Sequence, residues 1–285
     1  MNKPTHIHIL GICGTFMGGI AAIAKQAGFR VTGCDVNVYP PMSTQLQAQG
    51  IELISGFGLE QLELNPDLYV IGNVVTRGNV LMEEILNRNL PYASGPQWLS
   101  DTLLRDKWVL GVAGTHGKTT TTSLISVMLE NCSLDPTVII GGEVDLFNGN
   151  AKFGKGKYVV AEADESDGSF LYLKPLYSVI TNIEMEHVDY YKTINDAINA
   201  YSAFANNLKK TGTLFYNCED ENIKKMLTRF NGEGETFGFS KEADMYPYDI
   251  RLNEFCSSFQ SVYKNEILGR VFLKVPGCSP MVHKT

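Results

Sequence analysis

Short apolar runs alternate along the first hundred residues with segments whose apolar positions recur at helical spacing. The runs predict strands at residues 6–10, 29–34, 51–54, 68–75 and 91–94, and the periodic segments predict helices at 20–27, 43–49, 80–89 and 96–104. Regular alternation of this kind is typical of a mostly parallel sheet covered on both faces. We therefore predict an α/β, Rossmann-like domain over residues 1–106, which ends at a polar break.

The same alternation resumes beyond the break and then changes. Strands are predicted at residues 108–113, 137–140, 158–163, 178–183 and 214–216, and helices from 118 onward, at 194–208 and at 221–230. After about Glu235 the pattern has period two, at 257–264 and 267–275, with a hairpin turn at 264–266. We predict a second α/β domain over 107–277 that closes with an antiparallel sheet.

A glycine-containing loop joins the strand at 108–113 to the helix that follows it. Strand, glycine loop, lysine and helix together predict a nucleoside triphosphate site, because loop N–H groups and a helix N-terminus attract phosphate. The common pattern has a glycine where this chain has Val112, so Gly114 supplies the turn. A plain glycine-rich turn without a ligand is the alternative. The predicted nucleotide contacts are Gly114, Thr115, His116, Gly117, Lys118, Thr119 and Thr120.

A second glycine-rich turn follows the strand at 6–10 and resembles a dinucleotide fingerprint only in part. In the register that starts at Gly11, Cys13 and Phe16 stand where glycines belong, and Asp35 lies 21 positions after Gly14. These residues favour a nucleotide phosphate near Gly11 and Gly14 rather than NAD in particular. The alternative is a tight strand-to-helix turn without a ligand.

Two polar clusters follow strands of the second domain. Glu162, Asp164, Glu165 and Asp167 come after the strand at 158–163. Closely spaced carboxylates favour a Mg²⁺ site, since hard cations prefer oxygen ligands; a solvated acidic loop is the alternative.

The second cluster is 182–189, which contains Asn182 and His187. His187 is a candidate metal ligand or substrate-orienting group, with an ordinary surface histidine as the alternative. The carboxyl ends of parallel strands meet at one edge of a sheet. We therefore expect both clusters to lie beside the Lys118 loop.

Composition narrows the function further. The net charge of −7 argues against a nucleic-acid partner. No apolar run approaches the length of a membrane span, so no membrane partner is expected. The six cysteines form no C-x-x-C pair and are expected to be reduced. Without a signal-peptide pattern, the cytoplasm is the expected compartment.

Three motifs in order, GTHGKTTTTS, AEADESDGSF and TNIEMEHVDYY, resemble the Mur ligases, the ATP-dependent amide-forming enzymes of peptidoglycan synthesis. The resemblance covers residues 7–277, and GICGTFMGG with TGCD resembles the UDP-binding domain of that family. It implies ATP and Mg²⁺ as cofactors. It also implies UDP-N-acetylmuramate as a substrate, whose carboxylate ATP activates as an acyl phosphate before an amine attacks it.

The resemblance also implies roles for individual residues. Lys118 would contact the β- and γ-phosphates, and Thr119 and Glu162 would hold Mg²⁺. His187 would hold a second cation, and Asn182 would support the same site. The residues expected to lie against the UDP moiety are Gly11, Gly14 and Asp35.

Two branches of the family compete, and they differ in the amine. Residues 37–44, 71–73 and 77–79 resemble the branch that adds the tripeptide L-Ala-γ-D-Glu-meso-diaminopimelate, whereas the second domain resembles the branch that adds L-alanine. Residues 193–208 contain no lysine, which agrees with the L-alanine branch, since other branches carry a modified lysine there.

The last residues depart from the family. Residues 278–285 do not resemble it, whereas the family continues into a third domain that positions the amine. We therefore expect the 285-residue chain to bind nucleotide without turning over. Two alternatives remain: a nucleotide-binding P-loop module without ligase activity, and an NAD-dependent dehydrogenase built on residues 1–106.

Overall fold

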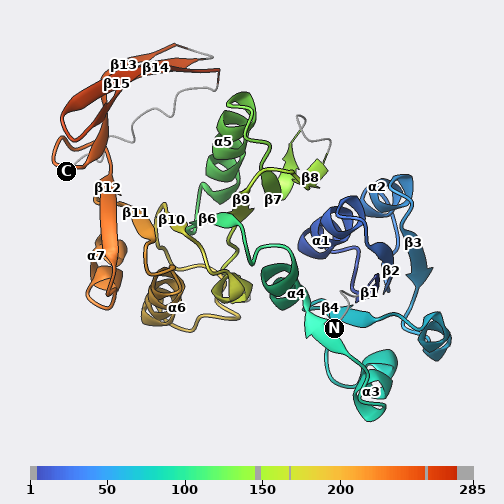
Figure 1. The fold of residues 1–285 in the computed structure, drawn as a ribbon. Coiled ribbons are helices and arrows are strands. Elements are labelled where there is room, and N and C mark those ends of the chain that lie inside the picture. Colours follow the sequence, from blue (N-terminus) through green and yellow to red (C-terminus); the bar gives the residue numbers. More distant parts are fainter. Residues whose placement is uncertain (1–4, 145–148, 167, 254–255, 275–285) are drawn as a thin grey trace.

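The first set of alternating strands and helices forms a parallel sheet of five strands, with the order β3-β2-β1-β4-β5 (Figure 1). The computed structural model describes residues 5–144, 149–166, 168–253 and 256–274. β1, at the centre, is buried along its whole length, as expected for a strand covered on both faces. The strands are β1 His6–Leu10, β2 Arg30–Asp35, β3 Glu52–Ser55, β4 Leu68–Ile71 and β5 Tyr92–Ser94.

Two helices of this unit, α3 and α4, begin where a side chain accepts a hydrogen bond from the first turn. The Asn79 side chain accepts a hydrogen bond from the Met82 N–H, and the Ser94 hydroxyl accepts one from Gln97. The helices are α1 Thr15–Gln26, α2 Met42–Ala48, α3 Val80–Asn87 and α4 Gly95–Thr102, with a 3₁₀ helix, η1, at Leu59–Leu64.

The second unit is built on a mixed sheet of ten strands, with the order β15-β14-β13-β12-β11-β10-β6-β9-β7-β8. Its central strands are parallel, while β8 runs antiparallel to β7 and β13, β14 and β15 form an antiparallel extension. The strands are β6 Trp108–Ala113, β7 Thr137–Val144, β8 Gly149–Lys152, β9 Tyr158–Glu162, β10 Tyr177–Ile180, β11 Thr213–Asn217, β12 Glu233–Phe237, β13 Met245–Leu252, β14 Ser257–Tyr263 and β15 Glu266–Leu273.

Helices cover the parallel part of this second sheet. Thr193 and Asp196 form a reciprocal capping box at the start of α6, and Asp220 caps α7. No helix in the described part of the chain is long and apolar enough to cross a membrane. The helices are α5 Lys118–Asn131, α6 Ile194–Asn206 and α7 Glu221–Leu227, with a 3₁₀ helix, η3, at Ser169–Tyr172. The chain is therefore an α/β protein with a Rossmann-like parallel sheet followed by a mixed sheet.

The two units pack directly on each other through α1 and β8. The Asn150 side chain of β8 donates a hydrogen bond to the Thr15 carbonyl at the start of α1, at 2.8 Å. The Gln26 side chain at the end of α1 accepts one from the Phe153 N–H, also at 2.8 Å. One hydrophobic cluster runs through both sheets without a break, so the interface is part of the core.

Most predicted elements are present, and the differences have local causes. The strand predicted at 68–75 ends at Ile71, because the chain turns where the Val75 N–H bonds to the Gly72 carbonyl. The helix predicted at 20–27 begins at Thr15, so its glycines lie inside it. β8 was not predicted. The hairpin at 264–266 is confirmed: Lys264 and Asn265 have positive φ between β14 and β15. Residues 275–285, including the predicted tail, lie outside the described residues.

Candidate active site at the phosphate loop

The loop between β6 and α5 has a backbone path that requires glycine at both ends. Gly114 has φ +139°, and a Cβ there would lie 1.9 Å from the Thr181 hydroxyl oxygen. Gly117 has φ +82° and is the N-cap of α5, so the helix begins at Lys118. The loop therefore presents its backbone beside a helix N-terminus, the arrangement that suits phosphate.

The end of β10 clamps this loop. The Thr115 hydroxyl accepts a hydrogen bond from the Glu184 N–H at 2.8 Å. The Asn182 side chain binds the backbone of His116 on both sides, accepting from its N–H at 2.8 Å and donating to its carbonyl at 3.1 Å. Asn182, predicted to support the metal site, lies against the loop. It can act by holding the loop backbone in place.

Lys118 folds back over the loop. Its ammonium donates hydrogen bonds to the carbonyls of Gly114 and Thr115, at 2.8 and 3.3 Å, and lies 3.0 Å from Glu165 Oε2. The Lys118 side chain is 12% exposed and that of Glu165 is 3% exposed, so this ion pair is largely buried. Thr120 lies exposed on the first turn of α5.

Thr119 and Glu162 meet across the sheet edge. The Thr119 hydroxyl donates to Glu162 Oε1 at 3.0 Å, and Glu162 Oε2 accepts from the Gly141 N–H at 2.7 Å. A Cβ at residue 141 would lie 2.9 Å from Glu162 Oε1, so glycine allows this approach. A hydroxyl and a carboxylate side by side are an oxygen pair of the kind that Mg²⁺ prefers.

His187 lies with a different pair of carboxylates. Ligand atoms of Asp164, Glu165 and His187 all lie within 4.8 Å of one another, and His187 Nε2 is 3.5 Å from Glu165 Oε1. The Tyr191 hydroxyl donates to the Glu165 carbonyl at 2.8 Å. Burial raises the pKa of the Glu165 carboxyl, and the nearby Lys118 ammonium opposes that rise.

The predicted metal residues therefore divide into two neighbouring sets. Thr119 lies with Glu162, whereas His187 lies with Glu165, which links it to Lys118. Sequence reasoning placed Glu165 in an acidic cluster without giving it a role. Asp167, from the same cluster, lies outside the described residues. Both sets suit a divalent cation beside a triphosphate, because they combine carboxylates, a hydroxyl and an imidazole at the edge of the Lys118 loop.

The first glycine-rich turn is closed by an acid rather than a lysine. Asp35 Oδ2 accepts a hydrogen bond from the Cys13 N–H at 3.0 Å, and Oδ1 accepts from Asn37 at 3.2 Å. Gly11 has φ +78°, and Gly14 is the N-cap of α1. The three residues predicted to bind UDP thus lie at one turn, with the carboxylate against its backbone.

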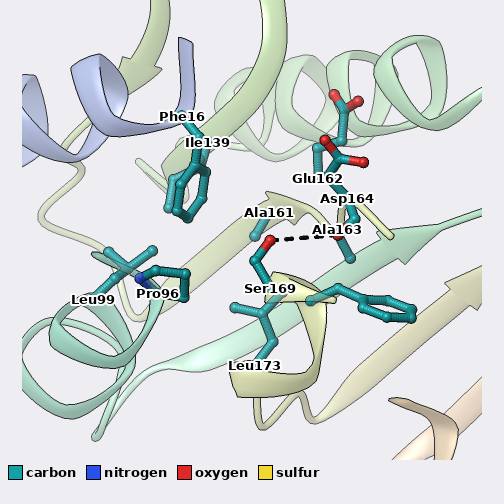
Figure 2. Close-up of a pocket in the computed structure, with 11 residues that line it drawn as sticks. Phe16, Pro96, Leu99, Ile139, Ala161, Glu162, Ala163, Asp164, Ser169 and Leu173 are labelled. Carbon is teal, nitrogen blue, oxygen red and sulfur yellow. Dashed lines mark hydrogen bonds between the residues drawn. The ribbon is translucent and has the colours of Figure 1, made fainter. Parts of the chain in front are cut away.

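Two hollows lie where the units meet, and both are lined by residues of the two units. A cavity of about 20 Å³, with room for roughly one water, lies between α1, α4, the end of β9 and η3 (Figure 2). Figure 2 shows the carboxylates of Glu162 and Asp164 pointing away from the apolar side chains of Phe16 and Leu99. A cleft of about 300 Å³ lies nearby, a volume at the lower end for small-molecule sites. It is lined by the ends of β4 and β5, by Met82 and Pro96, and by η3.

Two family descriptions match this chain. Residues 6–107 match the catalytic domain of the Mur ligase family, and residues 112–279 match the Mur ligase middle domain. A UDP-N-acetylmuramate–L-alanyl-γ-D-glutamyl-meso-2,6-diaminoheptandioate ligase from Escherichia coli K12 is 46% identical over 78% of this chain and 50% of its own length. A UDP-N-acetylmuramate–L-alanine ligase from Dictyoglomus turgidum is 40% identical over 97% of this chain and 59% of its own length. The chain thus spans between half and three fifths of these relatives.

Solved structures that resemble this chain are ligases of the same two kinds. The UDP-N-acetylmuramate:L-alanyl-γ-D-glutamyl-meso-diaminopimelate ligase from Neisseria meningitidis superimposes with a TM-score of 0.88 and 38% identity, covering 96% of this chain and 89% of that one. The UDP-N-acetylmuramate–alanine ligase from Thermotoga maritima gives a TM-score of 0.80 and 26% identity, covering 95% and 61%. Since the middle-domain match alone covers more than half of the residues, the chain belongs to the Mur ligase family.

Proposed function

We propose that this chain is part of an ATP-dependent ligase that joins UDP-N-acetylmuramate to an amine through an acyl phosphate. The observation that carries the proposal is the meeting of Lys118, Thr119 and Glu162 at the N-terminus of α5, beside the seam between the two units. Relatives with both amine specificities support it. The amine is L-alanine or the tripeptide L-Ala-γ-D-Glu-meso-diaminopimelate.

The proposal gives each unit one substrate. Residues 1–106 would form the UDP-sugar domain, with Gly11, Gly14 and Asp35 at the nucleotide and the 300 Å³ cleft open to the sugar. Residues 107–277 would form part of the ATP domain. Substrates bound in these places would face each other across the seam, which brings the carboxylate of one toward the phosphates of the other.

In the ATP domain, this chain would act by binding and neutralising charge. Lys118 would bind the β- and γ-phosphates, while Thr119 and Glu162 would hold Mg²⁺, which supplies charge neutralisation when bound. His187, beside Asp164 and Glu165, would hold a second cation, and Asn182 would keep the loop in place. Phosphoryl transfer depends mainly on such positioning, so no covalent role for a side chain is needed.

The proposal is tested by trapping the acyl phosphate. The chain, extended beyond residue 277 with the corresponding region of a longer relative, is given Mg-ATP, UDP-N-acetylmuramate and hydroxylamine, which converts an acyl phosphate into a stable hydroxamate. A ligase forms hydroxamate that depends on both substrates, and Lys118→Met abolishes it. ATP binding without hydroxamate in this extended chain would favour a plain nucleotide-binding module. Binding of NAD in place of UDP would favour a dehydrogenase.

The amine is then identified by competition. The chain completed from a longer relative is given equal concentrations of L-alanine and the tripeptide, and the amide products are separated by mass. A product ratio far from one assigns the branch.

A further inference from the structure

Glu165 is the carboxylate that faces Lys118 in this structure. Glu165 Oε2 lies 3.0 Å from the Lys118 ammonium, which also donates a hydrogen bond to Glu165 Oε1 at 3.1 Å. Both side chains are nearly removed from water. A charge pair so placed is weakly screened, so its partners exert a strong influence on each other.

Hydrogen bonds to its carbonyl fix the main chain at Glu165, and its side chain is only 3% exposed. The Tyr191 hydroxyl and the Gly168 N–H both donate to the Glu165 carbonyl, at 2.8 and 3.2 Å. The Tyr201 phenol is buried nearby, and burial together with the Glu165 charge raises its pKa. Glu165 therefore has little freedom to turn toward solvent, whereas Lys118 has a long flexible stem.

The Lys118 ammonium cannot keep its hydrogen bonds to Glu165 and to the loop and at the same time bind the phosphates of a nucleotide. Its present acceptors are two loop carbonyls and Glu165, and binding of β- and γ-phosphates requires that it turn toward the ligand. Once Lys118 turns, the carboxylate of Glu165 remains buried within reach of the incoming negative charge. Metal-free nucleotide carries the most negative charge and should meet the greatest resistance.

We propose that Glu165 is a positioning residue that holds Lys118 against the loop and lowers the affinity for nucleotide that arrives without a divalent cation. This inference rests on the proposed ATP site at residues 114–120. It adds a role that neither Glu162 nor His187 fulfils, because among the described residues the carboxylate that lies within ion-pair distance of both Lys118 and His187 is that of Glu165. The consequence is selectivity for metal-bound over metal-free ATP.

The test is calorimetry of ATP binding to the 285-residue chain, once with excess EDTA and once with Mg²⁺. In Glu165→Gln, which keeps the size of the side chain and removes its charge, the Kd for metal-free ATP should fall at least tenfold. The Kd for Mg-ATP should fall by a smaller factor. A merely structural role of Glu165 predicts the opposite sign, namely weaker binding in both conditions.

Two matched variants separate charge from packing. Glu165→Asp keeps the charge and should leave the Kd for metal-free ATP within threefold of the unmodified chain. Glu184→Gln removes a carboxylate whose side chain is 62% exposed beside the same loop, and should change that Kd less than twofold. If Glu165→Gln fails to fold, as judged by thermal denaturation, Glu165→Ala replaces it with the same tenfold threshold.

The outcomes are distinguishable from failure of the proposed function. If the unmodified chain binds no ATP in either condition, the proposed ATP site is wrong, and this inference falls with it. If the chain binds Mg-ATP through Lys118 but Glu165→Gln binds metal-free ATP no more tightly, only the inference is overturned. An equal gain in Glu165→Asp would also overturn it, since the charge would then be irrelevant.

Discussion

The two glycine-rich loops of this molecule make the same kind of strand-to-helix connection but carry opposite charges. Each leaves the end of a buried strand and enters a helix, β1 to α1 and β6 to α5. In the first, the Asp35 carboxylate lies on the turn and accepts a hydrogen bond from a loop N–H. In the second, the Lys118 ammonium lies over loop carbonyls. The two loops therefore differ in the charge of the side chain that lies on the turn.

This difference implies a division of labour. A lysine at a helix N-terminus adds positive charge where the loop already favours phosphate. A carboxylate at the end of the second strand is the group that accepts hydrogen bonds from ribose hydroxyls in dinucleotide folds. We accordingly expect the second loop to depend on charge and the first loop to depend on geometry, and the following predictions test that contrast.

The largest effect is expected for Lys118→Met. Loss of the ammonium should raise the Kd for Mg-ATP about 1000-fold, which corresponds to ~4 kcal/mol, since a buried charge partner is removed. Calorimetry measures it. Lys25→Met is the matched control, because Lys25 also donates to a backbone carbonyl, that of Gly50, but lies in α1. An unchanged Kd for Mg-ATP in Lys118→Met would show that the loop does not bind the nucleotide.

The next effect concerns acid, and it should appear in the first unit. His8, on β1, is fully buried between Thr32 and Gln61, and burial lowers its pKa from 6.5 to about 4. The unfolded chain binds this proton more tightly, so acid favours unfolding. The contribution of neutral His8 to the free energy of unfolding is intact above pH 6.5. It is lost as the pH falls toward 4, by up to about 3 kcal/mol.

Urea unfolding at pH 7 and pH 5 measures this loss, and the fluorescence of Trp98 reports it from the first unit. Trp98 is buried in α4, whereas Trp108 is 40% exposed at the start of β6. In Trp108→Phe, the remaining Trp98 signal should shift to lower urea at pH 5. His8→Gln in the same background should reduce that pH dependence, and an equal pH dependence in both chains would refute the assignment.

A smaller effect is expected for Asn182→Ala, which releases the loop without changing charge. Both bonds to the His116 backbone are lost, so the Kd for Mg-ATP should rise about tenfold, or ~1.4 kcal/mol. Asn207→Ala is the control, since Asn207 also donates to a carbonyl, that of Leu171, away from the loop. Equal effects of the two variants would indicate general destabilisation rather than loss of the clamp.

The smallest effect is expected for Asp35→Asn. The amide keeps one acceptor oxygen for the turn but loses the charge, so the Kd for UDP should rise about threefold, or ~0.7 kcal/mol. Binding of Mg-ATP to the same variant serves as the internal control and should be unaffected. A thousandfold loss of UDP binding would show that the first loop depends on charge as strongly as the second.

The pattern of apolar residues predicted the parallel strands well, because a strand that is buried on both faces needs a continuous apolar run. It failed for β8, whose sequence GNAK has neither a run nor an alternation. That strand pairs with β7, the strand just before it, and packs on α1, which is distant in the chain. Local pattern cannot report such contacts.

The sequence predicted which residues of the candidate site lie close together, but it did not predict which side chains interact with each other. The carboxyl ends of β6, β9 and β10 bring Lys118, Glu162 and His187 to one edge, as their positions after strands indicated. Which carboxylate turns inward depends on the loop after Ala163, where the Tyr191 hydroxyl holds the Glu165 backbone. Four nearby acids look alike in sequence, so spacing alone could not select Glu165.

The contact between α1 and β8 constrains how this sequence can change over time. A Cβ on Gly19 would lie 3.3 Å from the Ala151 Cβ, so a larger residue at either position requires the other to yield. Asn150 and Thr15 are bound across the same contact. Descendants of this chain should therefore inherit substitutions at 19 and 151 as compensating pairs, and exchange of residues 1–106 between distant lineages should succeed only when β8 is exchanged with them.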